Sequence, residues 1–387
     1  MHYCKNCVLP STRPSVTIGE DGICSACRVH EQLQKIDWEK REKQFAEEAE
    51  RAISRSSGYD CVIPVSGGKD SHWQVVKCLE YDLYPLTVTW EPPEKTELGR
   101  KNLENLKSLG VDHISYSINP DVERKFLYRS LVEKGATGIP KHMALYHIPL
   151  KLAYRFDIPL VVWGENSGMI YGDLEDHEEG DEMQSRRYST KGVTDGTEAE
   201  DWISDDLSRQ ELTPYFGPGK EELAEKQIRS VYLGYFFDWD PRESLRVARE
   251  HGFKARSDAD DSNYYSFSDL ESNFVAIHHY LKWYKFGITR LFHNISFDIR
   301  NNRISRDEAI EVIRDRVPGT PFETIRRFTE HVNMDPQAFY RETERFRNRE
   351  IWTQREGQWV MDDFLIQDPQ FWNRYNDELA RLRDGSF

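Results

Sequence analysis

Short apolar runs alternate with amphipathic segments along the first half of the chain. The apolar runs cover residues 61–65, 84–89, 114–118 and 159–163. Between and after them lie segments with apolar side chains at helical spacing, at 70–81, 96–109, 121–134 and 141–156. This rhythm is typical of β-α-β units, whose strands form a parallel sheet. The pattern therefore predicts an α/β fold with a parallel sheet.

The flanking regions have different textures. Residues 1–30 have few helix signals, and residues 31–58 form a charged, helix-prone connector. After the last apolar run the chain is polar and acidic, and from about residue 220 it is helical and rich in aromatic residues. We therefore expect an α/β domain at 59–215 with an acidic lid at about 167–213. A helical C-terminal region at 216–387 would contact substrate or partner.

Charge and hydropathy narrow the classes of function. The chain has 387 residues and a formal net charge of -15, which opposes binding to nucleic acid or to an anionic membrane surface. No apolar run approaches the roughly 20 residues that span a bilayer, and the first residues lack a secretory signal pattern. These features predict a cytoplasmic protein with no nucleic-acid or membrane partner.

Four of the six cysteines form two pairs near the N-terminus. Cys4 and Cys7 make one C-x-x-C pair, and Cys24 and Cys27 make the second. This spacing is close to that of four-thiolate zinc sites, which are structural because no coordination position stays open. The pairs therefore predict a zinc knuckle, with four unrelated thiols as the alternative. The other two cysteines, Cys61 and Cys78, are expected in the core.

The first apolar run ends in a loop suited to an anion. In Ser66-Gly67-Gly68-Lys69-Asp70-Ser71 the glycines let backbone N–H groups turn toward a phosphate, and the following helix directs its N-terminus at the same place. The serines add hydroxyl donors and Lys69 adds a positive charge. Asp70 would bind Mg²⁺ or cap the helix. The loop is not a Walker sequence, and a plain glycine turn is the alternative.

A second polar stretch follows the fourth apolar run, at Trp163-Gly164-Glu165-Asn166. In α/β sheets, ligands bind beyond the carboxyl ends of the strands. Glu165 and Asn166 are therefore candidates to hold a ribose, a metal or a substrate amide. A strand-end turn without function is the alternative.

The loop sequence resembles the PP-loop of the N-type ATP pyrophosphatases, which split ATP to AMP and pyrophosphate while adenylating a carbonyl oxygen. The resemblance implies that the loop holds phosphates and that the end of the second strand, including Thr89 and Trp90, lies by the adenine. Lys69, Asp70, Glu165 and Asn166 would then be catalytic. The implied nucleotide contacts are Ser66, Gly67, Gly68, Lys69, Asp70, Ser71, Thr89, Trp90 and Gly164.

Motifs spread over most of the chain resemble the N-acetyl sugar amidotransferase family of surface-polysaccharide (lipopolysaccharide O-antigen) biosynthesis. They are the cysteine pairs, the loop, Trp163–Asn166, a late run at 277–287 and the segment 304–310. The resemblance implies ATP-dependent conversion of a sugar acetamido group into an acetamidino group, with Mg²⁺ and structural Zn²⁺. The implied partners are a nucleotide-activated N-acetyl sugar, a glutaminase and a cyclase-like subunit that supply ammonia, as in histidine biosynthesis.

The late run carries basic side chains at helical spacing, which can meet the phosphates or carboxylate of a nucleotide-linked sugar. The expected substrate contacts are His278, Lys282, Lys285, Arg290, His293 and Asn294, with Lys141 and His142 as further candidates. Solvated helix charges are the alternative. The sequence leaves open both a diacetamido uronic acid and a nine-carbon sugar.

Two other functions stay open. A tRNA thiolase shares PP-loop adenylation and zinc cysteines, although the acidic charge and the lack of a spare cysteine pair near the loop oppose it. A zinc-ribbon scaffold with a decayed loop is the non-enzymatic alternative, opposed by the intact loop sequence.

Overall fold

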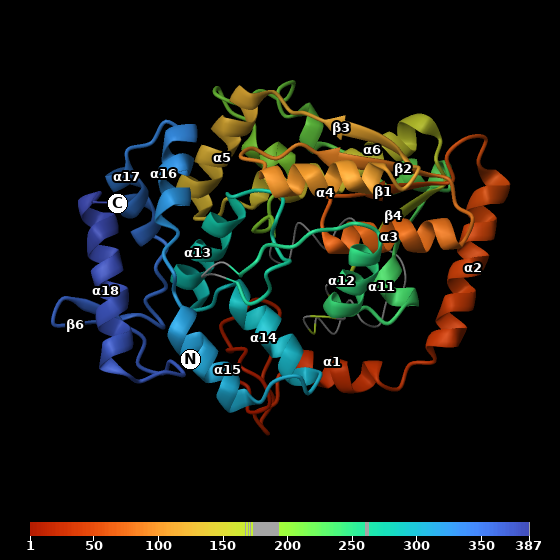
Figure 1. Ribbon diagram of the computed structural model, residues 1–387. Coiled ribbons are helices and arrows are strands. Elements are labelled where there is room, and N and C mark those ends of the chain that lie inside the picture. The colour runs from red at the N-terminus through yellow and green to blue at the C-terminus, as the bar shows by residue number, and fades with distance from the viewer. Residues whose placement is uncertain (167, 169, 171, 173–192, 260–262, 387) are drawn as a thin grey trace.

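A five-stranded parallel sheet forms the centre of the α/β part (Figure 1). The computed structural model describes residues 1–166, 168, 170, 172, 193–259 and 263–386. The strand order is β3-β2-β1-β4-β5, and every pairing in this sheet is parallel. The strands are β1 Cys61–Pro64, β2 Pro85–Trp90, β3 Asp112–Tyr116, β4 Leu160–Trp163 and β5 Arg229–Tyr232. The predicted α/β fold is confirmed.

Strand β1 is central in the strand order, and it is buried on both faces. Val62 lies opposite Leu86 of β2 and Val161 of β4 in the register of the sheet. Its side chain joins the core on one face, whereas Cys61 and Ile63 join the core on the other. This alternation explains the continuous apolar run in the sequence, since a strand covered on both faces needs no polar side.

Helices cover both faces of the sheet. One face packs against α5 Pro120–Lys134 and α6 Ile139–Phe156, together with Trp202 and Tyr215 from two short 3-10 helices. On the other face lie α2 Trp38–Arg55, α3 Lys69–Glu80, α4 Glu97–Lys107, α11 Leu233–Phe236 and α12 Pro241–Glu250. Cys61 and Cys78 are fully buried in this second core, as expected.

Two regions differ from the sequence pattern. Strand β5 lies where the pattern indicated helices, because it has only four residues and a single fully buried one, Val231. The later part of the expected lid, around 199–215, packs into the core through Trp202 and Tyr215. Residues 167, 169, 171 and 173–192 of that lid lie outside the described residues.

The C-terminal region is largely helical and shares a core with the N-terminal cysteines. Its helices are α13 Val275–Phe286, α14 Arg290–Arg300, α15 Arg306–Arg316, α16 Phe322–His331, α17 Pro336–Glu344 and α18 Pro369–Asp384. A hairpin of β6 Thr353–Arg355 and β7 Gln358–Val360 packs against α18. In Figure 1 the N-terminal segment lies beside α14 and α15, and α1 Ser25–Leu33 and α2 lead from there to the sheet.

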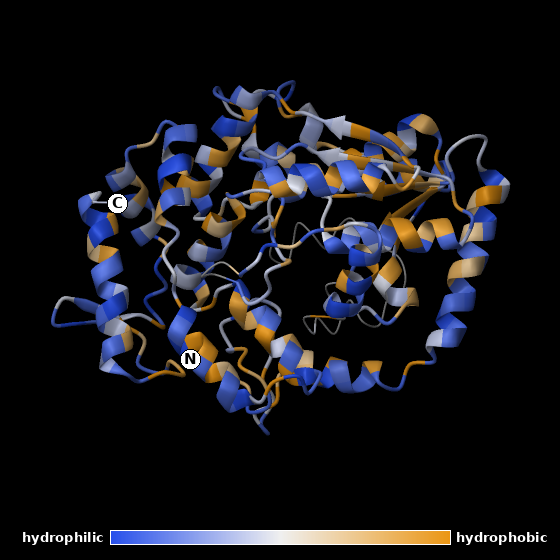
Figure 2. Cartoon of the chain, in the orientation of Figure 1, coloured by the Kyte–Doolittle hydropathy of each residue, from blue (hydrophilic) through white to orange (hydrophobic). Residues whose placement is uncertain are grey.

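Hydropathy follows these layers. In Figure 2 orange residues gather in the central strands of the sheet, and α18 shows mostly blue residues. Among the described residues, no helix is both long enough and apolar enough to cross a bilayer.

Candidate functional site

The loop between β1 and α3 depends on Gly67. Its φ is +84°, and a Cβ added there would lie 2.8 Å from the backbone nitrogen of Leu103. Both the left-handed backbone and the close approach of α4 therefore require glycine. As a result, the chain turns sharply from the end of β1 into the first turn of α3.

The loop leaves the N-terminus of α3 without a side-chain cap. Gly68 is the N-cap residue, and no side chain accepts from the first N–H groups of the helix. The hydroxyl of Ser71 accepts from the backbone N–H of Ser66 at 2.9 Å, and the Ser66 hydroxyl lies 3.3 Å from the Gly68 nitrogen. Uncapped N–H groups at the positive end of a helix dipole suit a phosphate.

Lys69 and Asp70 pair with each other beside this helix end. The Lys69 amine lies 2.5 Å from Oδ2 of Asp70, and the indole N–H of Trp239 donates to Oδ1 at 3.1 Å. The Lys69 amine also lies 5.6 Å from the centre of the Trp239 ring. Asp70 therefore does not cap the helix, and both of its oxygens have partners. Sequence patterns did not single out Trp239, because its contact spans 169 residues.

The end of β2 braces the loop. The Thr89 hydroxyl donates to the carbonyl of Val65 at 2.5 Å, and the Val65 N–H donates to the carbonyl of Val88 at 2.8 Å. Thr89 is thus committed to a structural bond within the core. Trp90 is buried next to Glu123, and burial raises the pKa of that carboxyl to about 8.

The end of β4 brings a carboxyl close to the loop. Burial raises the pKa of Glu165, the Asp70 carboxylate raises it further, and the Lys69 and Arg290 cations oppose both. Glu165 thus interacts electrostatically with both the loop and Arg290 of α14. Its neighbour Asn166 is buried, and its Oδ1 accepts from the N–H of Gly168 at 2.9 Å. Gly164 accepts at its carbonyl from the N–H of Gly234 at 3.0 Å.

Helices α13 and α14 bring five basic side chains together, and we call them the α13–α14 cluster. They are His278, His279, Lys282, Arg290 and His293. Asp269 is the acidic counterpart, since its Oδ2 lies 3.3 Å from His279 and 3.8 Å from Arg290. Burial works to raise the pKa of Asp269, but the charges of Arg290 and His279 outweigh it and hold the pKa well below the usual range.

Helix α6 reaches the same cluster from the α/β part. The rings of His142 and His278 lie 6.0 Å apart, and the Lys141 amine pairs with Glu271 at 2.8 Å. A Cβ on Gly138 would lie 2.9 Å from Nδ1 of His278, so α13 packs directly on the start of α6. Both candidates from this helix therefore lie beside the C-terminal candidates.

The cluster disfavours protonation of its own members. Burial, aided by the charges of Arg290 and Arg13, lowers the pKa of Lys282 to about 7. Burial lowers the pKa of His142 to about 3 and that of His279 to about 4. An anion bound here would favour the protonated forms of these groups and raise their pKa values.

Two of the expected substrate residues, Lys285 and Asn294, are not members of the α13–α14 cluster. The Lys285 amine donates to the carbonyl of Lys134 at the end of α5, at 3.0 Å. Asn294 donates to Oδ1 of Asn263 at 2.6 Å, and Asn263 donates to Asp269 at 2.8 Å. Lys285 therefore joins α13 to α5, and Asn294 holds the acidic counterpart of the cluster in place.

The N-terminal segment adds a residue that the sequence did not single out. Nε of Arg13 donates to Nε2 of His293 at 3.4 Å, across 280 residues. No local spacing marks Arg13, because its role depends on the docking of the cysteine segment on α14. The role of Arg13 can therefore be recognised only from the folded structure.

The four N-terminal cysteines form one buried group. Sγ of Cys4 lies 3.9 Å from that of Cys27, and Sγ of Cys7 lies 3.6 Å from that of Cys24. All four sulfur atoms lie within 4.8 Å of one another. A tetrahedral zinc with bonds of about 2.3 Å separates its sulfurs by about 3.8 Å, so the thiols fit such an ion. Backbone N–H groups of Cys7 and Cys24 point at Cys4, as expected for a thiolate.

Comparison with known proteins gives one family match. The model of the LPS biosynthesis protein WbpG-like, C-terminal domain matches residues 261–365. No curated protein sequence matches the chain. The solved structure of NMN synthetase from Francisella tularensis has 13% identity and a TM-score of 0.26, covering 50% of this chain and 96% of that chain. This TM-score is too low to indicate a shared fold. Over its C-terminal region, which includes α13 and α14, the chain is therefore similar to a domain of lipopolysaccharide biosynthesis proteins.

Proposed function

We propose that the protein is an ATP-dependent amidotransferase of lipopolysaccharide biosynthesis. It would adenylate the acetamido oxygen of a nucleotide-linked N-acetyl sugar and replace that oxygen with ammonia, giving an acetamidino sugar, AMP and pyrophosphate. The family match at residues 261–365 supports the biosynthetic role. The resemblance of the loop and of the other motifs supports the reaction.

One observation carries the proposal: the uncapped N-terminus of α3 lies beside a loop that only glycine allows at position 67, with Lys69 at the same place. The helix end and the lysine together supply N–H groups and positive charge for a polyphosphate. In the structure Lys69 is neutralised by Asp70. Bound phosphate would replace Asp70 as the partner of Lys69.

The chemistry needs a good leaving group. An acetamide oxygen leaves poorly, so direct attack by ammonia is slow, whereas the adenylated oxygen leaves as AMP. The chain must position the amide oxygen in line with the α-phosphorus and stabilise the charge that develops on pyrophosphate. Lys69 and the helix end would stabilise that charge. Glu165, whose pKa is raised by burial and by Asp70, would accept a proton from the nitrogen once ammonia has attacked.

Two metal ions belong to this proposal. Mg²⁺, when bound, would neutralise phosphate charge, and the carboxyl group that fits it is that of Asp70, beside Lys69 at the helix end. Zn²⁺ would be held by the four N-terminal thiols, which leave no open position and thus serve the fold. The α13–α14 cluster would meet the anionic groups of the nucleotide sugar.

Ammonia would come from a separate glutaminase through a cyclase-like subunit. All six cysteines of the chain are buried, four of them in the N-terminal group and two in the sheet core. None is therefore placed as an exposed nucleophile for glutamine. The same burial disfavours a tRNA thiolase, which needs a reactive thiol near the loop.

Mass spectrometry of candidate nucleotide sugars tests the function. The protein is incubated with sugar, ATP, Mg²⁺ and ammonium, and the proposed product is lighter than the substrate by about 1 mass unit because NH replaces O. AMP and pyrophosphate must appear in equal amounts with it, by the stoichiometry of adenylation. Formation of ADP, or thiolation of added tRNA, would contradict the proposal. Lys69→Ala is the variant expected to abolish the reaction.

A further inference from the structure

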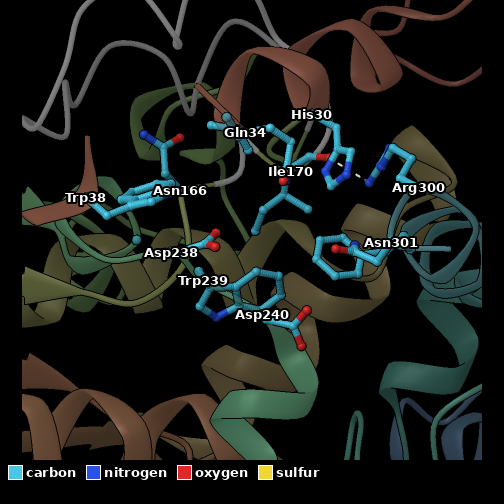
Figure 3. A pocket seen from close by; sticks show the side chains of 13 residues that line it. His30, Gln34, Trp38, Asn166, Ile170, Asp238, Trp239, Asp240, Arg300 and Asn301 are labelled. Atoms are coloured by element: carbon cyan, nitrogen blue, oxygen red, sulfur yellow. Dashed lines mark hydrogen bonds between the residues drawn. The ribbon is translucent and has the colours of Figure 1, made fainter. Parts of the chain in front are cut away.

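A cleft beside the loop is lined mostly by residues that the proposed reaction has not used. It lies between α1, the start of α2, the segment joining α11 to α12, and α14 (Figure 3). We call it the α1–α14 cleft. Its cavity volume is about 60 Å³. The lining residues that carry the argument are Gln34, Trp38, Asp238, Trp239, Arg300 and Asn301.

Arg300 is a buried cation with free donors in this cleft. Its relative exposure is 6%, and its Nη2 donates to the carbonyl of Ile170 at 3.0 Å. Within the described part of the chain, its Nε and Nη1 are buried and have no hydrogen-bond partner. Burying N–H groups of a guanidinium without a partner is costly. A ligand with an anionic group would satisfy both donors.

Much of the remaining lining consists of aromatic side chains and of amide or carboxylate side chains. Figure 3 shows Trp38 and Asn166 on one side, Arg300 and Asn301 on the other, and the Asp238 and Trp239 side chains between them. Asp240 caps α12 and pairs with Arg303, so its carboxylate has partners. Asp238 is exposed and makes no hydrogen bond or ion pair with the described residues, so its carboxylate is open to a ligand.

This combination suits a sugar. A pyranose has an apolar C–H face, which packs on an indole ring, and a rim of hydroxyl groups, which pair with carboxylate and amide side chains. Trp38 and Trp239 offer the rings, and Asp238, Gln34 and Asn301 offer the polar groups. Arg300 adds a site for one anionic group on the same ligand.

Trp239 links the cleft to the nucleotide loop. Its ring lines the cleft, while its indole N–H holds Oδ1 of Asp70 and its face lies 5.6 Å from the Lys69 amine. Asn166, which also lines the cleft, directly follows Glu165 at the end of β4. A ring bound in the cleft would therefore lie next to the groups assigned to ATP.

We propose that the α1–α14 cleft binds the acceptor sugar, with the ring on an indole of the cleft and an anionic group of the substrate on Arg300. The proposal rests on the proposed function for the identity of the acceptor. It places the sugar on the α1 side of Trp239. The α13–α14 cluster is then left for other anionic groups of the two substrates.

Binding measurements by calorimetry test the cleft directly. The probes are UDP, UDP-N-acetylglucosamine and UDP-glucuronic acid, each titrated into protein whose loop is filled with a non-hydrolysable ATP analogue. Arg300→Met is expected to weaken binding about tenfold or more, and Arg300→Lys less. Arg246→Met is the control, since Arg246 lies exposed on α12 and pairs with Glu243 and Glu250.

The three probes identify the anion. If Arg300 binds the diphosphate, Arg300→Met weakens all three probes alike. If it binds a ring carboxylate, only UDP-glucuronic acid is weakened. Because Arg300 is buried and its loss can affect folding, Asp238→Ala serves as the second variant, at an exposed position. It is expected to weaken UDP-N-acetylglucosamine several-fold and to leave binding of the ATP analogue unchanged.

Two results would overturn the proposal. One is wild-type protein that binds none of the probes at millimolar concentration. The other is unchanged probe binding in both Arg300→Met and Asp238→Ala. The proposed function fails in a different way, through the absence of AMP and of the acetamidino product. Loss of probe binding in the variants would support the cleft even then, and intact amidination with unchanged probe binding would refute only the cleft.

Discussion

Nε of Arg13 donates to Nε2 of His293 at 3.4 Å, so the cysteine segment contributes a cation to the α13–α14 cluster. The contact places the guanidinium beside groups whose pKa values are already low. For Lys282, burial is the main cause of the low pKa, and the charges of Arg290 and Arg13 lower it further. Such crowding of positive charge is unfavourable in the ligand-free protein, and a bound anion relieves it.

Loss of Arg13 should weaken the binding of anionic substrate. In Arg13→Met the cluster loses one cation, and we expect KM for the nucleotide sugar to rise about tenfold while the fold is kept. Arg28→Met is the matched control, because Arg28 lies in the same segment but pairs with Asp21 on the surface. Steady-state kinetics on both variants make the comparison. Equal KM values would show that Arg13 does not act on the substrate.

Removal of the metal should disorder the segment that carries Arg13. A chelator that strips Zn²⁺ from the four thiols is expected to lower Tm and to raise KM for the sugar, as in Arg13→Met. Elemental analysis should find about one zinc per chain, as a single four-thiolate site requires. Full activity in metal-free protein would show that the cysteine segment does not contribute to the site.

Gly67 should tolerate no side chain. The left-handed φ of +84° and the approach of Leu103 predict that Gly67→Ala costs about 1–3 kcal/mol of stability and abolishes ATP binding. Gly58→Ala is the control, since nothing lies within 4 Å of a Cβ added there. Urea unfolding and nucleotide titration check the pair. ATP binding by Gly67→Ala would refute the role assigned to this turn.

Lys282 should make stability depend on pH. Its pKa is about 7 in the folded chain, below the ordinary 10.5, so the unfolded chain binds more protons between these values. Stability should therefore rise with pH from about 7 to 10, by at most about 1.4 kcal/mol per pH unit. Lys282→Met removes this slope and stabilises the protein at pH 7. The measurement is urea unfolding of both proteins at pH 7 and 9, and parallel profiles would contradict it.

Glu123 should act in the opposite direction. Its folded pKa of about 8 exceeds the ordinary 4.5, so the folded chain keeps a proton that the unfolded chain loses. Its contribution to stability is present at low pH and disappears as pH rises from about 4.5 to 8. Glu123→Gln stays neutral, and we expect it to be more stable than wild type at pH 8.5 by on the order of 2 kcal/mol. Thermal unfolding at pH 5 and 8.5 checks the difference, which should be small at pH 5.

The sequence could predict the parts of the site that local pattern determines. Alternating apolar runs predicted the parallel sheet, and the loop and Glu165 were marked by their place after strands. Helical spacing also marked His278 and Lys282, which the fold places together. Their roles stay predictions until they are measured.

The remaining parts depend on contacts between distant segments. Trp239 and Arg13 follow no spacing rule, because each acquires its partner only when separate regions pack together. Lys285 has the right spacing, but the packing of α13 on α5 turns its amine toward Lys134. Strand β5 was missed since Arg229–Tyr232 is short and mostly polar outside Val231.

The sequence separation of 280 between Arg13 and His293 also determines when the site is completed. During synthesis the N-terminal cysteine segment leaves the ribosome long before α14 exists, so its docking surface is absent. Closing so long a loop is entropically costly and comes after local structure has formed. The nucleotide loop can therefore fold with the sheet, while the neighbouring cationic cluster waits for the C-terminal helices. A chain truncated before the C-terminal helices would keep the nucleotide loop and lack the α13–α14 cluster. A nascent protein would therefore be unable to process substrate before translation is nearly finished.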